Sequence, residues 1–197
     1  MKKHIIDLRI TFVDRLHPRY VLIKGTPADG SRLPEMLPGQ FAQLKVEGSP
    51  ETYLRRPISI HDVTSDTVTS TNKGDEVSFL IALAGKGTRQ LATLKVGDTL
   101  NCIIPLGRGF SMPTTDAPRI LLCGGGVGIA PLLLMGRRMK EAGFEPTFLL
   151  GGRSAGDILR LSEYEALGKV YVTTEDGSMG EQGFVTQHSL WDNAAFD

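Results

Sequence analysis

Residues 119–176 alternate between short apolar runs and longer amphipathic segments, an order that few folds accommodate. "RILLCGG", "EPTFLLGG" and "KVYVTTED" are typical of strands, and "IAPLLLMGRRMKEAG" and "DILRLSEYEALG" are typical of helices. A β-α-β-α-β order predicts a parallel sheet with crossover helices. We therefore expect an α/β domain over residues 118–197, with three strands.

Residues 1–110 follow a different pattern, with short β-branched or alternating runs separated by turn signals. One helical stretch, "TRQLATLK", interrupts them. The pattern predicts a six-stranded antiparallel barrel of Greek-key type over residues 1–112. "SMPTTDAP", residues 111–118, is typical of a linker. The predicted strands are "HIIDLRITFV", "RYVLIKGT", "QFAQLKVEG", "RPISIHDV", "EVSFLIALA" and "TLNCIIPL".

Composition excludes several classes of protein. Lys plus Arg and Asp plus Glu both number 22, and no basic block indicates a nucleic-acid partner. No apolar run approaches the ~20 residues of a membrane-spanning helix, and the start of the chain does not resemble a signal peptide. Cys102 and Cys123, the two cysteines, lie in strand-like runs. We expect two buried thiols and a cytoplasmic protein without a metal site.

The run "CGGGVGIAP" follows the first strand of the α/β half. It places Gly124, Gly125, Gly126 and Gly128 between that strand and the first helix, where open parallel sheets bind nucleotides. Free N–H groups and the helix dipole attract phosphate there, and side chains would block its approach. The spacing is not G-x-G-x-x-G, so a tight turn with close helix packing stays open as an alternative. If the glycines bind a nucleotide, the α/β half is a Rossmann-like domain.

Two motifs of the barrel half also suit a diphosphate. In "LRRPISI", Arg56 offers a planar fork of donors, Pro57 indicates an edge strand or irregularity, and Ser59 offers an N–H and a hydroxyl. In "ALAGKGTRQL", a strand leads through 85–88 into a short helix. Either motif alone is also compatible with an ordinary edge strand or a capped turn. Together with the glycine run, they predict FAD on the barrel and a nicotinamide dinucleotide on the α/β domain.

The pattern resembles the ferredoxin-NADP reductase-like superfamily. More narrowly, it is similar to the electron-transfer subunits of bacterial NAD-dependent dihydroorotate dehydrogenases. The matching pieces span essentially the whole chain, and "RRPISI" combined with "CGGGVGIAPL" is the specific part. The other matches are "GKGT", "LLGGRS" and "TEDGSMGEQGFVT".

The resemblance implies a set of cofactor-binding residues and no catalytic side chain. Arg56 would bind the FAD diphosphate, Ser59 would face the reactive N5 atom, and Ile58 stands where many members have a stacking tyrosine. Pro57 and Ile58 would bind FAD together with Arg56 and Ser59. The second flavin segment would be Leu80, Ile81 and Ala82, and the second diphosphate contact would be Gly87 and Thr88. The four glycines of the run would bind the NAD diphosphate, and Asp176 and Gly177 would lie near the nicotinamide end.

The resemblance also implies a place in pyrimidine biosynthesis. Electrons would pass from an FMN-containing catalytic subunit, through a [2Fe-2S] cluster and FAD, to NAD, within a heterotetramer. A [2Fe-2S] cluster needs four ligands, and the two cysteines cannot supply them. We therefore expect that the chain lacks the family's C-terminal iron–sulfur region.

Two other functions stay open at the level of sequence. One is the flavin subunit of a sulfhydrogenase or a ferredoxin-NADP transhydrogenase, and the other is a flavin- or nucleotide-binding module without turnover. The choice between NAD and NADP is also open, because Arg153 and Ser154 follow the second strand, where a 2′-phosphate would lie.

Overall fold

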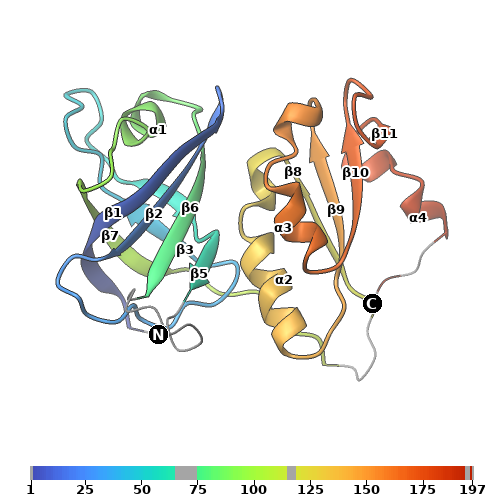
Figure 1. Ribbon diagram of the computed structural model, residues 1–197, viewed down its shortest axis with the longest axis horizontal. Coiled ribbons are helices and arrows are strands. Elements are labelled where there is room, and N and C mark those ends of the chain that lie inside the picture. The colour runs from blue at the N-terminus through green and yellow to red at the C-terminus, as the bar shows by residue number, and fades with distance from the viewer. Residues whose placement is uncertain (1, 65–74, 115–118, 194–195, 197) are drawn as a thin grey trace. The chain divides into compact units, whose positions relative to one another are not determined.

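A computed structural model describes residues 2–64, 75–114, 119–193 and 196. The chain divides into two compact units, Met1–Phe110 and Ser111–Asp197. Each unit is built around its own sheet (Figure 1). The predicted linker, residues 111–118, lies partly outside the described residues.

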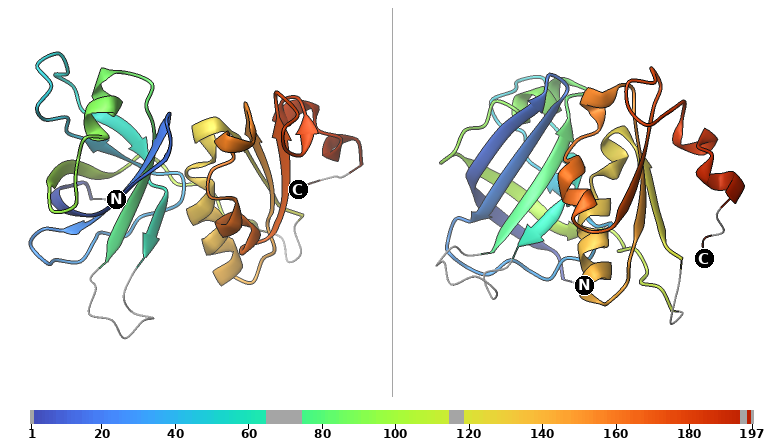
Figure 2. Two further views of the ribbon diagram at one scale, coloured as in Figure 1. Left: turned by 45° about the horizontal axis from the view of Figure 1, so that its top comes forward. Right: turned by 45° about the vertical axis from the view of Figure 1, so that its right-hand side comes forward.

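The first unit is an antiparallel sheet with one short helix, α1 (Lys86–Leu91). The strand order is β4-β3-β7-β1-β2-β6-β5, so β4 and β5 are the edge strands. Figure 2 shows the sheet curving round on itself as a half-barrel. The strands are β1 (His4–His17), β2 (Tyr20–Pro27), β3 (Phe41–Leu44), β4 (Arg56–Ser59), β5 (Asp62–Thr64), β6 (Glu76–Ala82) and β7 (Thr99–Leu106).

The described sheet has seven strands where six were predicted, because the run "RPISIHDV" forms two strands. The backbone N–H of Ile60 donates to Gln40 O at 3.0 Å, and that of His61 donates to Ser78 O at 2.9 Å. The chain thus leaves β3 and joins β6 between these two residues, and both side chains are buried. Pro57 lies on edge strand β4, as predicted, where its missing N–H breaks no interior ladder.

The second unit is a parallel sheet of order β11-β10-β9-β8. It has the predicted β-α-β-α-β order, and β11 is a fourth, two-residue strand that the sequence pattern did not predict. Its strands are β8 (Leu121–Gly125), β9 (Thr147–Gly152), β10 (Lys169–Thr174) and β11 (Glu181–Gln182). Its helices are η1 (Gly126–Ile129), α2 (Leu132–Glu141), η2 (Ala155–Asp157), α3 (Leu161–Glu165), η3 (Val185–Gln187) and α4 (Leu190–Asn193).

Helices α2 and α3 cover one face of this sheet, and the segment with α4 lies on the other side (Figure 2). Phe148 of β9 packs edge-on against Tyr164 of α3, with ring centroids 5.3 Å apart, and both side chains are fully buried. The Tyr164 hydroxyl donates to Ile129 O at 2.9 Å, which ties α3 to the turn after β8. This bond holds the end of η1, which follows the glycine run, against α3.

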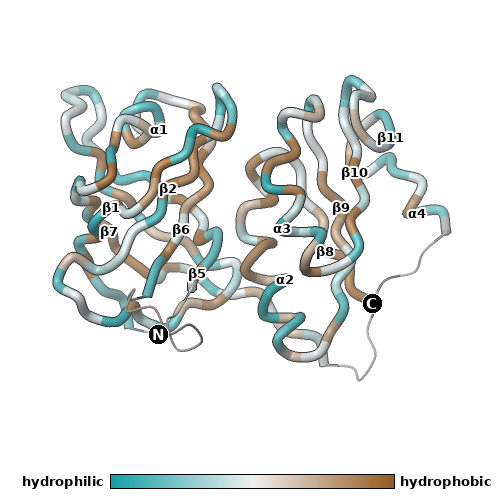
Figure 3. The backbone as a smooth tube through the Cα atoms, viewed as in Figure 1, coloured by the Kyte–Doolittle hydropathy of each residue, from teal (hydrophilic) through white to brown (hydrophobic). Residues whose placement is uncertain are grey.

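Hydropathy follows this arrangement. Figure 3 shows hydrophobic stretches along β8, β9 and α2, and a hydrophilic loop after β10. Among the described residues, no helix is both long and apolar enough to cross a membrane.

Candidate functional site

Two neighbouring arginines at the start of β4 differ in whether their guanidinium groups are hydrogen-bonded within the protein. The guanidinium of Arg55 donates to Gln43 O at 3.2 Å, to Asn101 O at 3.1 Å and to Asn101 Oδ1. Arg55 therefore joins the β4 segment to β3 and β7. Within the described part of the chain, the guanidinium of Arg56 has no recorded hydrogen bond or ion pair. Its donors are thus available for a ligand, whereas those of Arg55 are engaged.

Arg56 packs across the start of α1. A Cβ added to Gly87 would lie 2.5 Å from Nε of Arg56 and 3.1 Å from Cγ2 of Thr52. Gly87 is buried and lies in the first turn of α1, where backbone N–H groups lack helical partners. The structure therefore brings together Arg56 and Gly87, which belong to two separate sequence motifs.

The other polar residues of the "GKGT" turn interact with nearby groups. The Thr88 hydroxyl bonds the backbone of Gly85, with 3.1 Å to both its N and its O. Lys86 forms an exposed ion pair with Glu51. For these two residues, a ligand contact through the side chain would have to replace an existing interaction.

The second predicted flavin segment contributes mainly to the core. Leu80 and Ile81 are buried, with 1% and 0% of their surface exposed, and Ala82 is partly exposed. Successive side chains of a strand point to opposite faces, so Leu80 and Ile81 are buried on different faces of β6, and only the backbone and the small Ala82 side chain of this segment are suited to a ligand contact. Ile58 and Ser59 on β4 are both partly exposed.

The glycines of the run 124–128 differ in what requires them. Gly126 has φ +55°, which disfavours other residues, and a Cβ on Gly124 would lie 3.0 Å from Leu132 Cδ1. Gly125 and Gly128 are exposed, and a Cβ on either would meet nothing within 4 Å. The fold alone therefore accounts for Gly124 and Gly126, whereas Gly125 and Gly128 leave open space at the end of β8. Pro131 precedes α2 as its N-cap.

Asp176 and Gly177 form the turn after β10. The Ser178 hydroxyl and N–H donate to Asp176 Oδ1 at 2.6 and 3.0 Å, and these bonds lower the pKa of the Asp176 carboxyl below its usual value. Gly177 has φ +72°, as this turn requires. Ser178 was not among the predicted site residues, although the sequence "DGS" is itself a turn signal.

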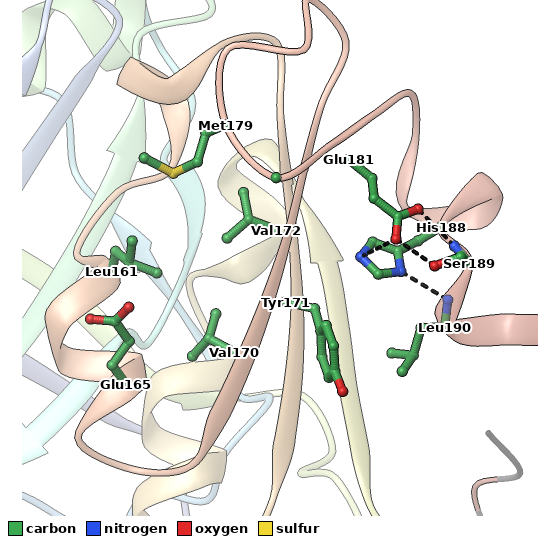
Figure 4. Close-up of a pocket in the computed structure, with 11 residues that line it drawn as sticks. Leu161, Glu165, Val170, Tyr171, Val172, Met179, Glu181, His188, Ser189 and Leu190 are labelled. Carbon is green, nitrogen blue, oxygen red and sulfur yellow. Dashed lines mark hydrogen bonds and ion pairs between the residues drawn. The ribbon is translucent and has the colours of Figure 1, made fainter. Parts of the chain in front are cut away.

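A hollow of about 680 Å³ lies along β10, and none of the predicted site residues lines it (Figure 4). At one side, Glu181 accepts hydrogen bonds from the Ser189 hydroxyl and N–H, and its Oε1 lies 3.5 Å from Nε2 of His188. The N–H of Leu190 donates to His188 Nδ1. These groups satisfy one another and fasten the C-terminal segment to the sheet.

The cysteines correct one expectation. Cys102 is buried as predicted, and burial raises its pKa to about 12. Cys123 is exposed, because its neighbour Leu122 packs on the α2 side of β8 and Cys123 therefore points to the opposite face of the sheet. Among the described residues, no group of three or more His, Cys, Asp or Glu side chains is placed to hold a metal ion.

Sequence relatives share one description. The chain is 37% identical over 163 residues to the dihydroorotate dehydrogenase B (NAD(+)) electron transfer subunit of Shouchella clausii, and 40% identical over 160 residues to that of Listeria monocytogenes. The chain is similar to these electron transfer subunits over about four fifths of its own length. These matches cover 81% and 80% of the chain but only 60% and 59% of the relatives. No protein-family model matches it.

Solved structures agree on the architecture. An NADH-dependent reduced ferredoxin-NADP oxidoreductase superposes with a TM-score of 0.78 at 27% identity, covering 96% of this chain and 65% of that one. The FAD/NAD-binding domain of a Vibrio cholerae nitric oxide dioxygenase gives 0.75 at 20% identity, covering 90% and 78%, and supports the fold alone. The chain therefore has the antiparallel half-barrel and parallel α/β sheet of ferredoxin reductase-like proteins.

Proposed function

We propose that the chain is the FAD- and NAD-binding part of the electron transfer subunit of a dihydroorotate dehydrogenase. It would accept electrons that an FMN-containing catalytic subunit takes from dihydroorotate, and pass them to NAD in pyrimidine biosynthesis. The observation that carries the proposal is the pairing of Arg56 with Gly87 on a chain similar to these subunits. It brings an available guanidinium next to the first turn of a helix, where N–H groups have no helical partners, a combination that suits a diphosphate.

The first unit would hold FAD. The Arg56 fork and the first-turn N–H groups of α1 would bind the diphosphate, while Gly87 keeps the surface between them free of a side chain. Ser59, with the backbone of Leu80, Ile81 and Ala82, would orient the ring. When bound, the flavin can accept or donate a hydride and can also transfer single electrons. No acid, base or nucleophile is therefore required of the chain.

The second unit would hold NAD through the glycine turn. Gly125 and Gly128 leave the end of β8 open to a diphosphate, and the positive φ of Gly126 shapes the turn. Asp176 and Gly177 would define the loop at the neighbouring strand end. The exposed Arg153 stands on the same edge of the sheet, after β9.

The two cysteines do not fit a [2Fe-2S] cluster. Cys102 and Cys123 lie in different units, and four ligands are needed. We therefore derive no electron step through a cluster on this chain. The chain spans about three fifths of the relatives' length, so the partner subunit and the complete electron path are part of the proposal.

A second candidate is a ferredoxin–NAD(P) transhydrogenase flavin subunit, which the superposition on the NADH-dependent ferredoxin-NADP oxidoreductase favours. The test is reconstitution of the full chain with FAD, followed by NADH titration with the flavin absorption as readout. Bound FAD that NADH reduces supports both candidates. Recovery of an FMN-containing dihydroorotate-oxidising partner from the native host distinguishes the first. A chain that binds neither cofactor would contradict the proposal.

A further inference from the structure

The loops that follow β9 and β10 run side by side beyond the end of the sheet. The ladder ends with Thr174 paired to Gly152. Two backbone bonds then extend the pairing, since Glu175 N–H donates to Gly152 O and Asp176 N–H donates to Arg153 O, both at 3.1 Å. The loops therefore stay together where the chains would otherwise separate.

One hydroxyl makes the next link between the two loops. Ser178 Oγ accepts a hydrogen bond from the backbone N–H of Ala155 at 2.7 Å and donates its proton to Asp176 Oδ1 at 2.6 Å. The carboxylate fixes the direction of the hydroxyl proton, so an oxygen lone pair is left facing Ala155. A group on the β10 loop thus holds the first residue of η2, on the β9 loop.

The hydrogen bond between Ala155 and Ser178 lies at one end of a short segment that carries the positively charged side chain of Arg153. Arg153, whose carbonyl oxygen accepts the last backbone bond, and Ser154 come directly before Ala155. Ser154 is held in turn by Asp157, whose Oδ2 accepts from both its N–H and its hydroxyl at 3.2 Å. The side chain of Arg153 is exposed, and within the described ranges no hydrogen bond or ion pair is recorded for its guanidinium. Its backbone is therefore fixed on both sides while its side chain is available.

We propose that Ser178 is a positioning residue of the nucleotide site: its hydroxyl holds the loops after β9 and β10 in one arrangement and so places Arg153 for the dinucleotide. The inference rests on the proposed function, because it assigns NAD to this edge of the sheet. Ser178 touches no reacting atom and acts through Ala155. Its exposed hydrogen bonds contribute little to global stability, so its loss changes ligand affinity more than unfolding.

The experiment compares NADH dissociation constants of the full chain and three variants. Ser178→Ala removes the hydroxyl, Ser178→Thr keeps it, and Ser189→Ala is the matched control. Ser189 also donates its hydroxyl and N–H to one carboxylate, that of Glu181, but it joins different segments. We expect the dissociation constant to rise about three- to tenfold in Ser178→Ala, and to stay within about twofold of wild type in the other two.

Amide hydrogen exchange at Ala155 gives a readout that does not depend on the nucleotide. Exchange should be faster in Ser178→Ala and restored in Ser178→Thr. If wild type binds NADH and Ser178→Ala binds it equally well, or if exchange at Ala155 is unchanged, the positioning role is wrong. If wild type binds no NADH, the proposed function is wrong, and with it the assignment of this edge to the dinucleotide.

Discussion

A Cβ on Gly87 would lie 2.5 Å from Nε of Arg56, closer than any ordinary contact. The first turn of α1 therefore lies against the guanidinium of Arg56 on β4, although 31 positions separate Gly87 from Arg56 (87 minus 56). Only a residue without a side chain leaves Arg56 in this position. The pair links two motifs that the sequence presents separately.

Gly87→Ala should displace Arg56 and weaken FAD binding. The methyl group must push the guanidinium aside, and because Arg56 is a flexible, partly exposed side chain, this costs little stability but moves its donors away from the start of α1. Gly85→Ala is the control, because a Cβ there meets nothing within 4 Å and the φ of Gly85 is −148°. We expect lower flavin occupancy after reconstitution for Gly87→Ala alone. Equal occupancy in both variants would contradict the role of the pair.

The two neighbouring arginines should differ in what their loss changes. Arg56→Ala removes a charge-assisted contact worth about 1.5–3 kcal/mol, which corresponds to a FAD dissociation constant raised roughly 10- to 150-fold. Arg55→Ala breaks bonds to Gln43 and Asn101 and should lower the free energy of unfolding by about 1–3 kcal/mol. Flavin titration and urea denaturation of both variants separate these effects. Arg56→Ala with unchanged flavin affinity would exclude it as a diphosphate ligand.

Gly128→Val should weaken NADH binding without destabilising the protein. The valine side chain enters open space, so the unfolding midpoint is expected to stay the same. The same side chain would block the space through which the dinucleotide reaches the backbone. An affinity at least about tenfold lower, near 1.4 kcal/mol, is expected from NADH titration. FAD occupancy serves as the internal control. Unchanged NADH affinity would mean that the glycine is only part of a turn.

Local pattern was enough for much of the fold. The β-α-β-α-β order of the second unit and the edge position of Pro57 follow from short-range rules, and both are confirmed. What the pattern missed depends on distant partners. The break between β4 and β5 results from bonds of Ile60 and His61 to Gln40 and Ser78, which no periodicity within "RPISIHDV" indicates.

The sequence also predicted one part of the candidate site and missed another. Arg56 and the glycine run were found because their residue types suit phosphate, and their ligand roles stay predictions. Ser178 was missed because its significance comes from Ala155, 23 positions away on another loop. The exposure of Cys123 was missed because an apolar strand does not reveal from its own residues which of its faces the helices cover.

The two thiols should react at very different rates. Cys123 is exposed, and partial burial raises its pKa, so it should react with a thiol reagent more slowly than a free cysteine but completely. Cys102 is fully buried, and its pKa of about 12 keeps it protonated, so it should react only through unfolding. Reagent titration should therefore give one thiol in the native chain and two in denaturant. Cys123→Ser should remove the native signal, and a remaining fast thiol would show that the core around Cys102 opens.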